Sequence, residues 1–185
     1  NGAEGGIATW AEVKAQARNL LGIELDDADV LNVPLLATDQ YGKFIPHPVT
    51  GFAQIVVSAG PPPVLQSGTP ANPVDASLAV KTGHAFLDDI AHSAAPVLIG
   101  GVLAPDADSV AGNNVAVDPQ TGARLEYDDE LLNAHFITGD GRGNENIGLT
   151  AVHHVFHSEH NRVLDDIKAL IDAQTDDPAF QEEWK

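Results

Sequence analysis

Residues 149–173 read LTAVHHVFHSEHNRVLDDIKALIDA, and this stretch decides the fold class. An α-helix turns by about 100° per residue, which places the apolar side chains of the stretch on one stripe. Ser158, Arg162 and Asp166 fall away from that stripe. The pattern predicts the longest helix of the chain. Its apolar stripe contains Leu149, Val152, Phe156, Val163, Leu164, Ile167, Leu170 and Ile171.

Other segments show helical signals of ordinary length. Residues 10–21 have helical apolar spacing, and Thr9 and Glu12 before and within them have the spacing of a capping box. Gly22 then predicts the end of that helix. Further helices are expected over 82–94 and 127–137, a short helical turn over 26–31, and a helix start at Asp177-Pro178.

Prolines shape the region between these helices. Residues 33–75 contain isolated prolines and the run Pro61-Pro62-Pro63, which exclude a long helix there. One short strand is expected near residues 53–57, and residues 97–118 are expected to form a loop. The sequence therefore predicts a mainly α protein whose helices are joined by long irregular loops.

Composition narrows the classes of function. The 185 residues include no cysteine and carry a formal net charge of -18. The lack of cysteine excludes disulfides, zinc–thiolate sites and iron–sulfur clusters. The negative charge disfavours nucleic acid and anionic lipid as partners, and no apolar run approaches the roughly 20 residues of a membrane span. An acidic, cysteine-free chain fits a secreted bacterial protein, which is the localisation we expect.

Residues 139–146 read GDGRGNEN and lie just before the long helix. Glycines at 139, 141 and 143 allow tight turning and close approach to another group. The loop therefore presents Arg142 and Glu145 as a fixed cation and carboxylate. A surface loop with a weak ion pair is the ordinary alternative for such a pair of residues.

Together the loop and the long helix resemble the animal-type haem peroxidases, the peroxidase–cyclooxygenase superfamily. That family has a Gly-Asp-x-Arg-x-x-Glu loop followed by a helix with Glu-His-Asn-Arg. Here Gly139-Asp140-Gly141-Arg142-Gly143-Asn144-Glu145 precedes Glu159-His160-Asn161-Arg162 in the same order. The earlier part of the chain is similar, more loosely, to the bacterial, peroxinectin-like branch.

The resemblance implies roles for three residues. Arg142 matches the catalytic distal arginine, whose permanently charged guanidinium suits the negative charge that develops when an O–O bond breaks. Glu145 matches the cofactor-binding carboxylate along the haem edge. Asn146 takes the adjacent cofactor-binding position, where myeloperoxidase has a methionine that forms a sulfonium link, a link that asparagine cannot form.

The resemblance also implies what the rest of the protein supplies. The cofactor would be haem b in the parent protein, the substrates hydrogen peroxide and a halide or small organic donor, and the partner the remainder of the parent chain. The distal histidine motif, with its Asp-His pair, does not occur in this sequence, and the proximal histidine belongs to a later helix. The isolated piece is therefore expected to bind haem poorly, if at all, and to be inactive.

The expected domain organisation follows. Residues 1–185 form a single internal fragment of a haem peroxidase-like catalytic domain. Residues 1–8 would be a linker, 9–137 helices and long loops, and 138–185 the distal arginine loop with the long helix.

Two other functions stay open. His153, His157 and His160 share an arc of roughly 60° on the predicted helix, and the i, i+4 pair has metal-site spacing, so a divalent metal-binding module is one alternative. Because this arc overlaps the apolar stripe, the simpler interpretation is that these histidines are core or interface residues hydrogen-bonded to their neighbours. A non-catalytic structural domain derived from the peroxidase fold is the other alternative. The acidic runs, including Asp128-Asp129-Glu130, lack the spacing of a calcium loop and are expected to be solvated helix starts or faces.

Overall fold

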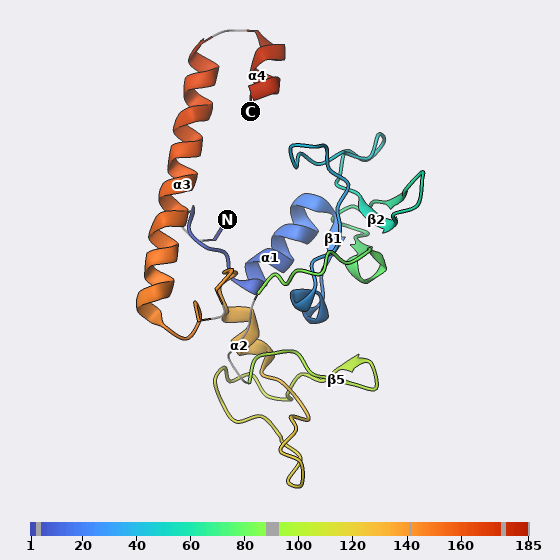
Figure 1. The fold of residues 1–185 in the computed structure, drawn as a ribbon, viewed down its shortest axis with the longest axis vertical. Helices are drawn as coiled ribbons and strands as arrows, with labels where there is room; N and C mark the ends of the chain where they lie inside the picture. Colours follow the sequence, from blue (N-terminus) through green and yellow to red (C-terminus); the bar gives the residue numbers. More distant parts are fainter. Residues whose placement is uncertain (3–4, 88–92, 141, 175–176, 185) are drawn as a thin grey trace.

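The computed structural model describes all residues except 3–4, 88–92, 141, 175–176 and 185 (Figure 1). Within the described part, helices are the main regular elements and strands are short. The helices are α1 (Trp10–Gln16), α2 (Asp129–Ala134), α3 (Ile147–Gln174) and α4 (Pro178–Trp184), with a π-helical turn η2 (Ala17–Leu21) and 3₁₀ turns η3 (Asp27–Leu31) and η4 (Ala76–Leu78). The strands are β1 (Ile23–Glu24), β2 (Ile55–Ser58), β3 (Val64–Gln66), β4 (Val74–Asp75), β5 (Leu98–Ile99) and β6 (Val102–Leu103).

The first helix forms as its sequence predicts. The Thr9 side chain accepts from the Glu12 backbone, and the Glu12 carboxylate accepts from the Thr9 backbone, which completes the capping box. Helical structure continues from α1 through η2 and ends at Gly22, whose φ of 69° is the left-handed conformation of a glycine C-cap. The expected short helical turn is also present as η3, which Asp26 caps.

Around α1 lies a core with a buried carboxylate at its centre. Asp27 accepts hydrogen bonds from the Trp10 indole and the Tyr127 hydroxyl, both at 2.8 Å, and from the Lys14 ammonium at 2.7 Å. Because every partner donates to the same buried carboxylate, one side chain joins η3, α1 and the segment before α2. The largest apolar side chains of this core are Trp10, Ile23, Val30, Ile55, Leu87, Tyr127 and Leu132.

The strands form three separate pairs. β1 runs parallel to β4 with Ile23 opposite Val74, so segments about fifty residues apart in sequence lie side by side. β2 pairs with β3 in an antiparallel ladder, and the expected strand near residues 53–57 is thus confirmed with slightly later bounds. β5 and β6 form a small hairpin inside the loop expected over 97–118.

The prediction of a helix over 82–94 is wrong for the residues described there, 82–87 and 93–94. These residues are irregular. Gly83 has a φ of 80°, outside the helical region. The backbone groups that a helix would use internally bind the segment near η3 instead, because Val33 donates to the His84 carbonyl and Phe86 donates to the Val30 carbonyl. Pairing with a distant segment overrides the local helical spacing.

Residues 1–8, predicted to be a linker, contact the body in their described part, 1–2 and 5–8. Ile7 is buried, and the Ala8 carbonyl accepts from the Ile137 amide at 2.8 Å. Next to it, Thr9 and Phe136 form an antiparallel bridge. This segment therefore packs on the body and holds the chain just before the loop of residues 138–146.

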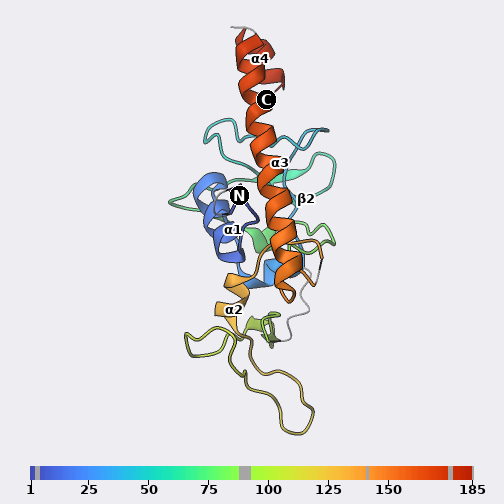
Figure 2. The same ribbon diagram turned by 90° about the vertical axis from the view of Figure 1, so that its left-hand side faces the viewer.

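The long helix α3 stands beside the body rather than inside it. Figures 1 and 2 show α3 running along one side and continuing well past α1, with α4 turning back at its far end. Much of its apolar stripe is open to solvent, with Phe156 73% and Leu170 59% exposed. No helix in the described part of the chain has the length and apolar character needed to cross a bilayer. The mainly α class with long loops is confirmed.

Candidate functional site

The loop of residues 138–146 is fixed to the body by Asn144. Its side-chain oxygen accepts from the Phe136 amide at 2.6 Å, and its side-chain amide donates to the Phe136 carbonyl at 2.9 Å. One side chain therefore satisfies both backbone groups of Phe136, as a neighbouring strand would. Gly143 is buried beside it, and a Cβ there would lie 2.5 Å from the Thr138 methyl group, so the loop requires glycine at this position.

The end of the loop is the start of α3. The Asn146 side-chain oxygen accepts from the amides of Gly148 and Leu149 at 3.0 and 3.1 Å, which is the role of an N-cap residue. The Thr150 hydroxyl also donates to the Gly143 carbonyl. Asn146, predicted to contact a cofactor, thus uses its side-chain oxygen to begin the helix, and its assignment to cofactor binding stays a prediction.

Arg142 is held in one orientation by Asp140. Its Nε and Nη2 donate to the two Asp140 oxygens at 3.0 and 2.7 Å, and its backbone amide donates to the same carboxylate at 3.0 Å. These bonds hold the pKa of the Asp140 carboxyl well below its ordinary value and raise the pKa of Arg142. The Arg142 side chain remains 74% exposed, so Nη1 is not taken up by the fork and can reach a ligand.

Glu145 lies on the same loop, three residues after Arg142. Its amide donates to the Arg142 carbonyl at 3.2 Å, which closes a turn between the two predicted site residues. The side chain is exposed, and among the described residues its carboxylate has no hydrogen-bond or ion-pair partner. The structure thus brings Arg142 and Glu145 onto one anchored turn, with a cation and a carboxylate both open to an incoming group.

The three histidines of the metal alternative do not converge. His153 and His157 are half-buried and line one cavity of about 410 Å³ with Ile7 and Thr138. His160 is exposed and contacts its neighbour Asn161 at 3.3 Å. The described residues contain no group in which these histidines could hold one ion together. The geometry gives the metal alternative no support.

The Glu-His-Asn-Arg stretch attaches α3 through its asparagine. The Asn161 amide donates to the Gly5 carbonyl at 2.6 Å and to the Asn1 side chain at 3.1 Å. Among the described residues, the partners of Arg162 lie on its own helix, at Glu159 and Asp166. Asn161 therefore attaches α3 to the N-terminal segment.

With this geometry in place, the comparison with known families becomes informative. Residues 101–184 match the model of the animal haem peroxidase family. The matched range includes the Arg142 loop and the whole of α3 and α4. No curated protein and no solved structure gave a significant match. The match supports a peroxidase-type function at the level of the family.

The charged groups of the loop are compatible with the haem-edge positions that the sequence predicts. Glu145 offers an exposed carboxylate without a partner among the described residues, and Arg142 offers a guanidinium nitrogen that Asp140 leaves free. Haem itself supplies the redox chemistry when it is bound.

Sequence reasoning missed the residues that hold Arg142 in place. The sequence analysis named Asp140 only as part of the Gly-Asp-x-Arg motif and assigned no role to Asn144. The Asp-x-Arg spacing could have revealed the role of Asp140. A carboxylate two residues before an arginine in a tight turn can accept hydrogen bonds from two of its guanidinium nitrogens. Nothing local could have revealed the role of Asn144, since its partner Phe136 lies eight residues earlier and is paired to Thr9.

Proposed function

We propose that this chain is part of a bacterial, peroxinectin-like haem peroxidase that uses hydrogen peroxide to oxidise a halide or small organic donor. The family match over residues 101–184 supports the class. The observation that carries the proposal is the Arg142–Asp140 fork on a loop fixed by Asn144. A single aimed guanidinium on a rigid turn is what charge stabilisation at a peroxide requires.

Arg142 acts in this proposal through charge. When the O–O bond of a peroxide breaks, negative charge develops on the departing oxygen, and a guanidinium keeps its own charge at any working pH. Its Nη1 is left free by Asp140, so the arginine can donate to that oxygen without giving up the fork. Glu145 would contact the cofactor edge, and haem would supply the electron transfer when bound.

The rest of the catalytic domain is proposed to cover α3. The stripe of α3 forms an apolar groove of about 390 Å³ that contains Phe156, Val163, Leu164 and Ile167. Apolar surface of this extent is seldom left open on a helix. Further protein from the parent chain, packed on this face, would bury the stripe.

The test uses the parent protein expressed with haem. We expect a Soret band and peroxide-dependent oxidation of bromide or of an organic donor such as guaiacol. Arg142→Ala should remove most of this turnover, whereas Arg162→Ala, which removes an equal charge from the exposed side of α3, should retain it. Equal turnover in wild type and Arg142→Ala would show that the role assigned to Arg142 is wrong.

A further inference from the structure

The side chains that lose electrons most easily are few in this chain, and two of them share one carboxylate. The sequence contains no cysteine and no methionine, and it has two tyrosines and two tryptophans. Thiols and thioethers are ordinarily among the first groups that oxidants attack, so their absence leaves tyrosine and tryptophan as the main oxidisable side chains. Trp10 and Tyr127 lie far apart in the sequence, yet both donate to Asp27.

The two oxygens of Asp27 have different partners. Oδ1 accepts from the Trp10 indole at 2.8 Å and from the Lys14 ammonium at 2.7 Å. Oδ2 accepts from the Tyr127 hydroxyl at 2.8 Å and has no other partner in the described part of the chain. The ion pair with Lys14 identifies the carboxylate as an anion. Oδ2 is therefore a proton acceptor within hydrogen-bond distance of the phenol.

The Tyr127 phenol is closed off from water. Its side chain is buried in the core, with 1% of the residue exposed. Burial, together with the hydrogen bond to Asp27, raises the pKa of Tyr127 well above its ordinary value, so the phenol carries its proton at neutral pH. Loss of one electron turns a phenol into a strong acid whose proton must leave. Asp27 Oδ2 is the acceptor that lies within reach of that proton.

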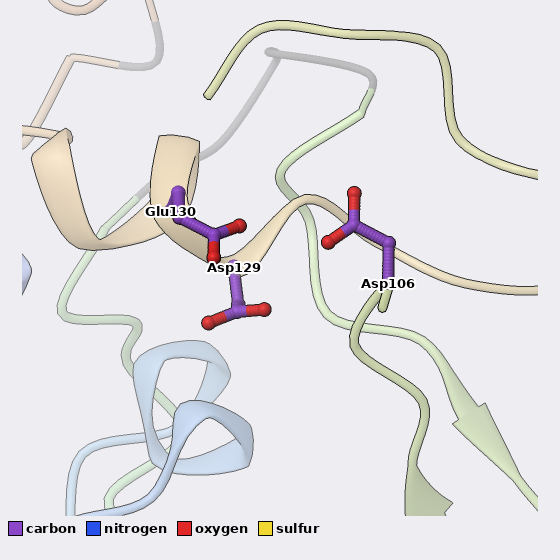
Figure 3. Close-up of side chains that lie close together, drawn as sticks. All are labelled: Asp106, Asp129 and Glu130. Carbon is purple, nitrogen blue, oxygen red and sulfur yellow. The ribbon is translucent and has the colours of Figure 1, made fainter. Parts of the chain in front are cut away.

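Negative charge beside Tyr127 favours this electron loss. The Asp106 amide donates to the Tyr127 carbonyl at 2.9 Å, which brings the Asp106 loop to the start of α2. There Asp106, Asp129 and Glu130 form an acidic group in which each places a carboxylate oxygen within 4.8 Å of the other two (Figure 3). Oxidation removes one negative charge from the Tyr127–Asp27 pair. It therefore relieves repulsion from the neighbouring carboxylates.

Lys14 has the opposite effect on Trp10. Its ammonium lies 5.8 Å from the centroid of the indole ring, where it disfavours the positive charge that an oxidised indole carries. The oxygen that faces the indole, Oδ1, also accepts from this ammonium. The environment of the carboxylate thus favours Tyr127 over Trp10 as the side chain from which the electron is finally lost.

We propose that Tyr127 is a redox-active tyrosine that releases its proton to Asp27. In the forward step the phenol gives one electron to a one-electron oxidant and its proton moves along the hydrogen bond to Oδ2. A neutral phenoxyl radical and a carboxylic acid remain. In the reverse step a donor returns one electron and Asp27 returns the proton. In the parent protein the oxidant would be the peroxide-oxidised haem, and this use rests on the proposed function.

The chain provides its own control for the test, because its other tyrosine, Tyr41, is 86% exposed. Flash photolysis of tris(bipyridine)ruthenium with a cobalt(III) ammine quencher supplies a one-electron oxidant without haem. The outcome is therefore separate from that of the peroxidase proposal. In Tyr41→Phe we expect the EPR spectrum of a tyrosyl radical, with one well-defined exchangeable proton hydrogen-bonded to its oxygen in electron–nuclear double resonance. Tyr127→Phe, which retains the exposed tyrosine, should lack this proton signal.

Removal of the proton acceptor gives the second readout. In the Tyr41→Phe protein, Asp27→Asn should lower the yield of the Tyr127 radical by at least about tenfold. Asp165→Asn, which removes an equal charge from exposed α3, should retain the yield. If circular dichroism shows that Asp27→Asn does not fold, the proton signal of Tyr41→Phe decides alone. The proposal is overturned if Tyr41→Phe forms no tyrosyl radical, if that radical lacks the exchangeable proton, or if folded Asp27→Asn gives an equal yield.

Discussion

The core around Asp27 and the helix α3 differ in how their apolar side chains are covered. In the core, one buried carboxylate receives donors from Trp10, Tyr127 and Lys14, and apolar side chains surround them. On α3, much of the apolar stripe faces solvent, with Phe156 73% exposed. The difference teaches that the core is stabilised within this chain, whereas α3 carries a surface suited to further protein.

The largest expected effect comes from Asp27→Ala. It leaves the Trp10 indole, the Tyr127 hydroxyl and the Lys14 ammonium without their acceptor, so we expect a loss of about 3–5 kcal/mol in the free energy of unfolding. Denaturant unfolding of this chain measures it. Asp165→Ala on exposed α3 should change the value by less than about 0.5 kcal/mol. A loss below about 1 kcal/mol for Asp27→Ala would remove the central role given to this carboxylate.

Paired leucine truncations test the comparison directly. Leu132 on α2 is fully buried, whereas Leu170 on α3 is 59% exposed. Leu132→Ala should cost about 2–5 kcal/mol through lost packing and a cavity, and Leu170→Ala should cost less than about 0.5 kcal/mol. Denaturant unfolding of the two variants gives both values. Equal losses would show that the α3 stripe is buried in this chain after all.

A smaller effect is expected at the loop anchor. Asn144→Ala removes two hydrogen bonds to Phe136, each contributing about 1 kcal/mol, so we expect a loss of about 1–2 kcal/mol. Asn114→Ala, at an exposed loop position, serves as the control and should be near neutral. If the two variants unfold alike, Asn144 does not hold the loop.

The smallest effect concerns the titration of Asp140. Its pKa should lie below the ordinary aspartate value of about 3.9, since Arg142 donates to both oxygens, and Arg142→Ala should raise it toward that value. Carbon-detected NMR of the carboxyl group measures both. The stabilisation from this pair is present above the ordinary pKa and is lost as the pH falls through the lowered one. The stability difference between wild type and Arg142→Ala should therefore shrink in acid. An unshifted Asp140 would mean that the fork does not persist in solution.

Local signals predicted much of this molecule. The Thr9–Glu12 capping box, the Gly22 stop and the proline start of α4 depend on neighbours within one helical turn, and all are present. The helix predicted over 82–94 could not be excluded from the local spacing. The backbone hydrogen bonds that prevent it join Val33 to His84 and Phe86 to Val30, which lie about fifty residues apart in the sequence. The exposure of the α3 stripe could not be predicted from local pattern either, because an apolar stripe predicts an apolar contact without saying which protein provides it.

The candidate site divides in the same way. Arg142 and Glu145 were found from the motif, and the structure adds the side chains that orient them, Asp140 and Asn144. The acidic group at α2 was interpreted as solvated helix ends, because Asp106 joins it only through pairing of its loop with Tyr127. Sequence spacing located the charged groups, and tertiary pairing determined their neighbours.

The most direct measurement is the rate at which hydrogen peroxide changes the Soret band of the haem-loaded parent protein in a stopped-flow experiment. If Arg142 stabilises the charge of the departing oxygen, Arg142→Ala should slow this rate by about 10²–10³, while Arg162→Ala should react like wild type. Equal rates for wild type and Arg142→Ala would contradict the account.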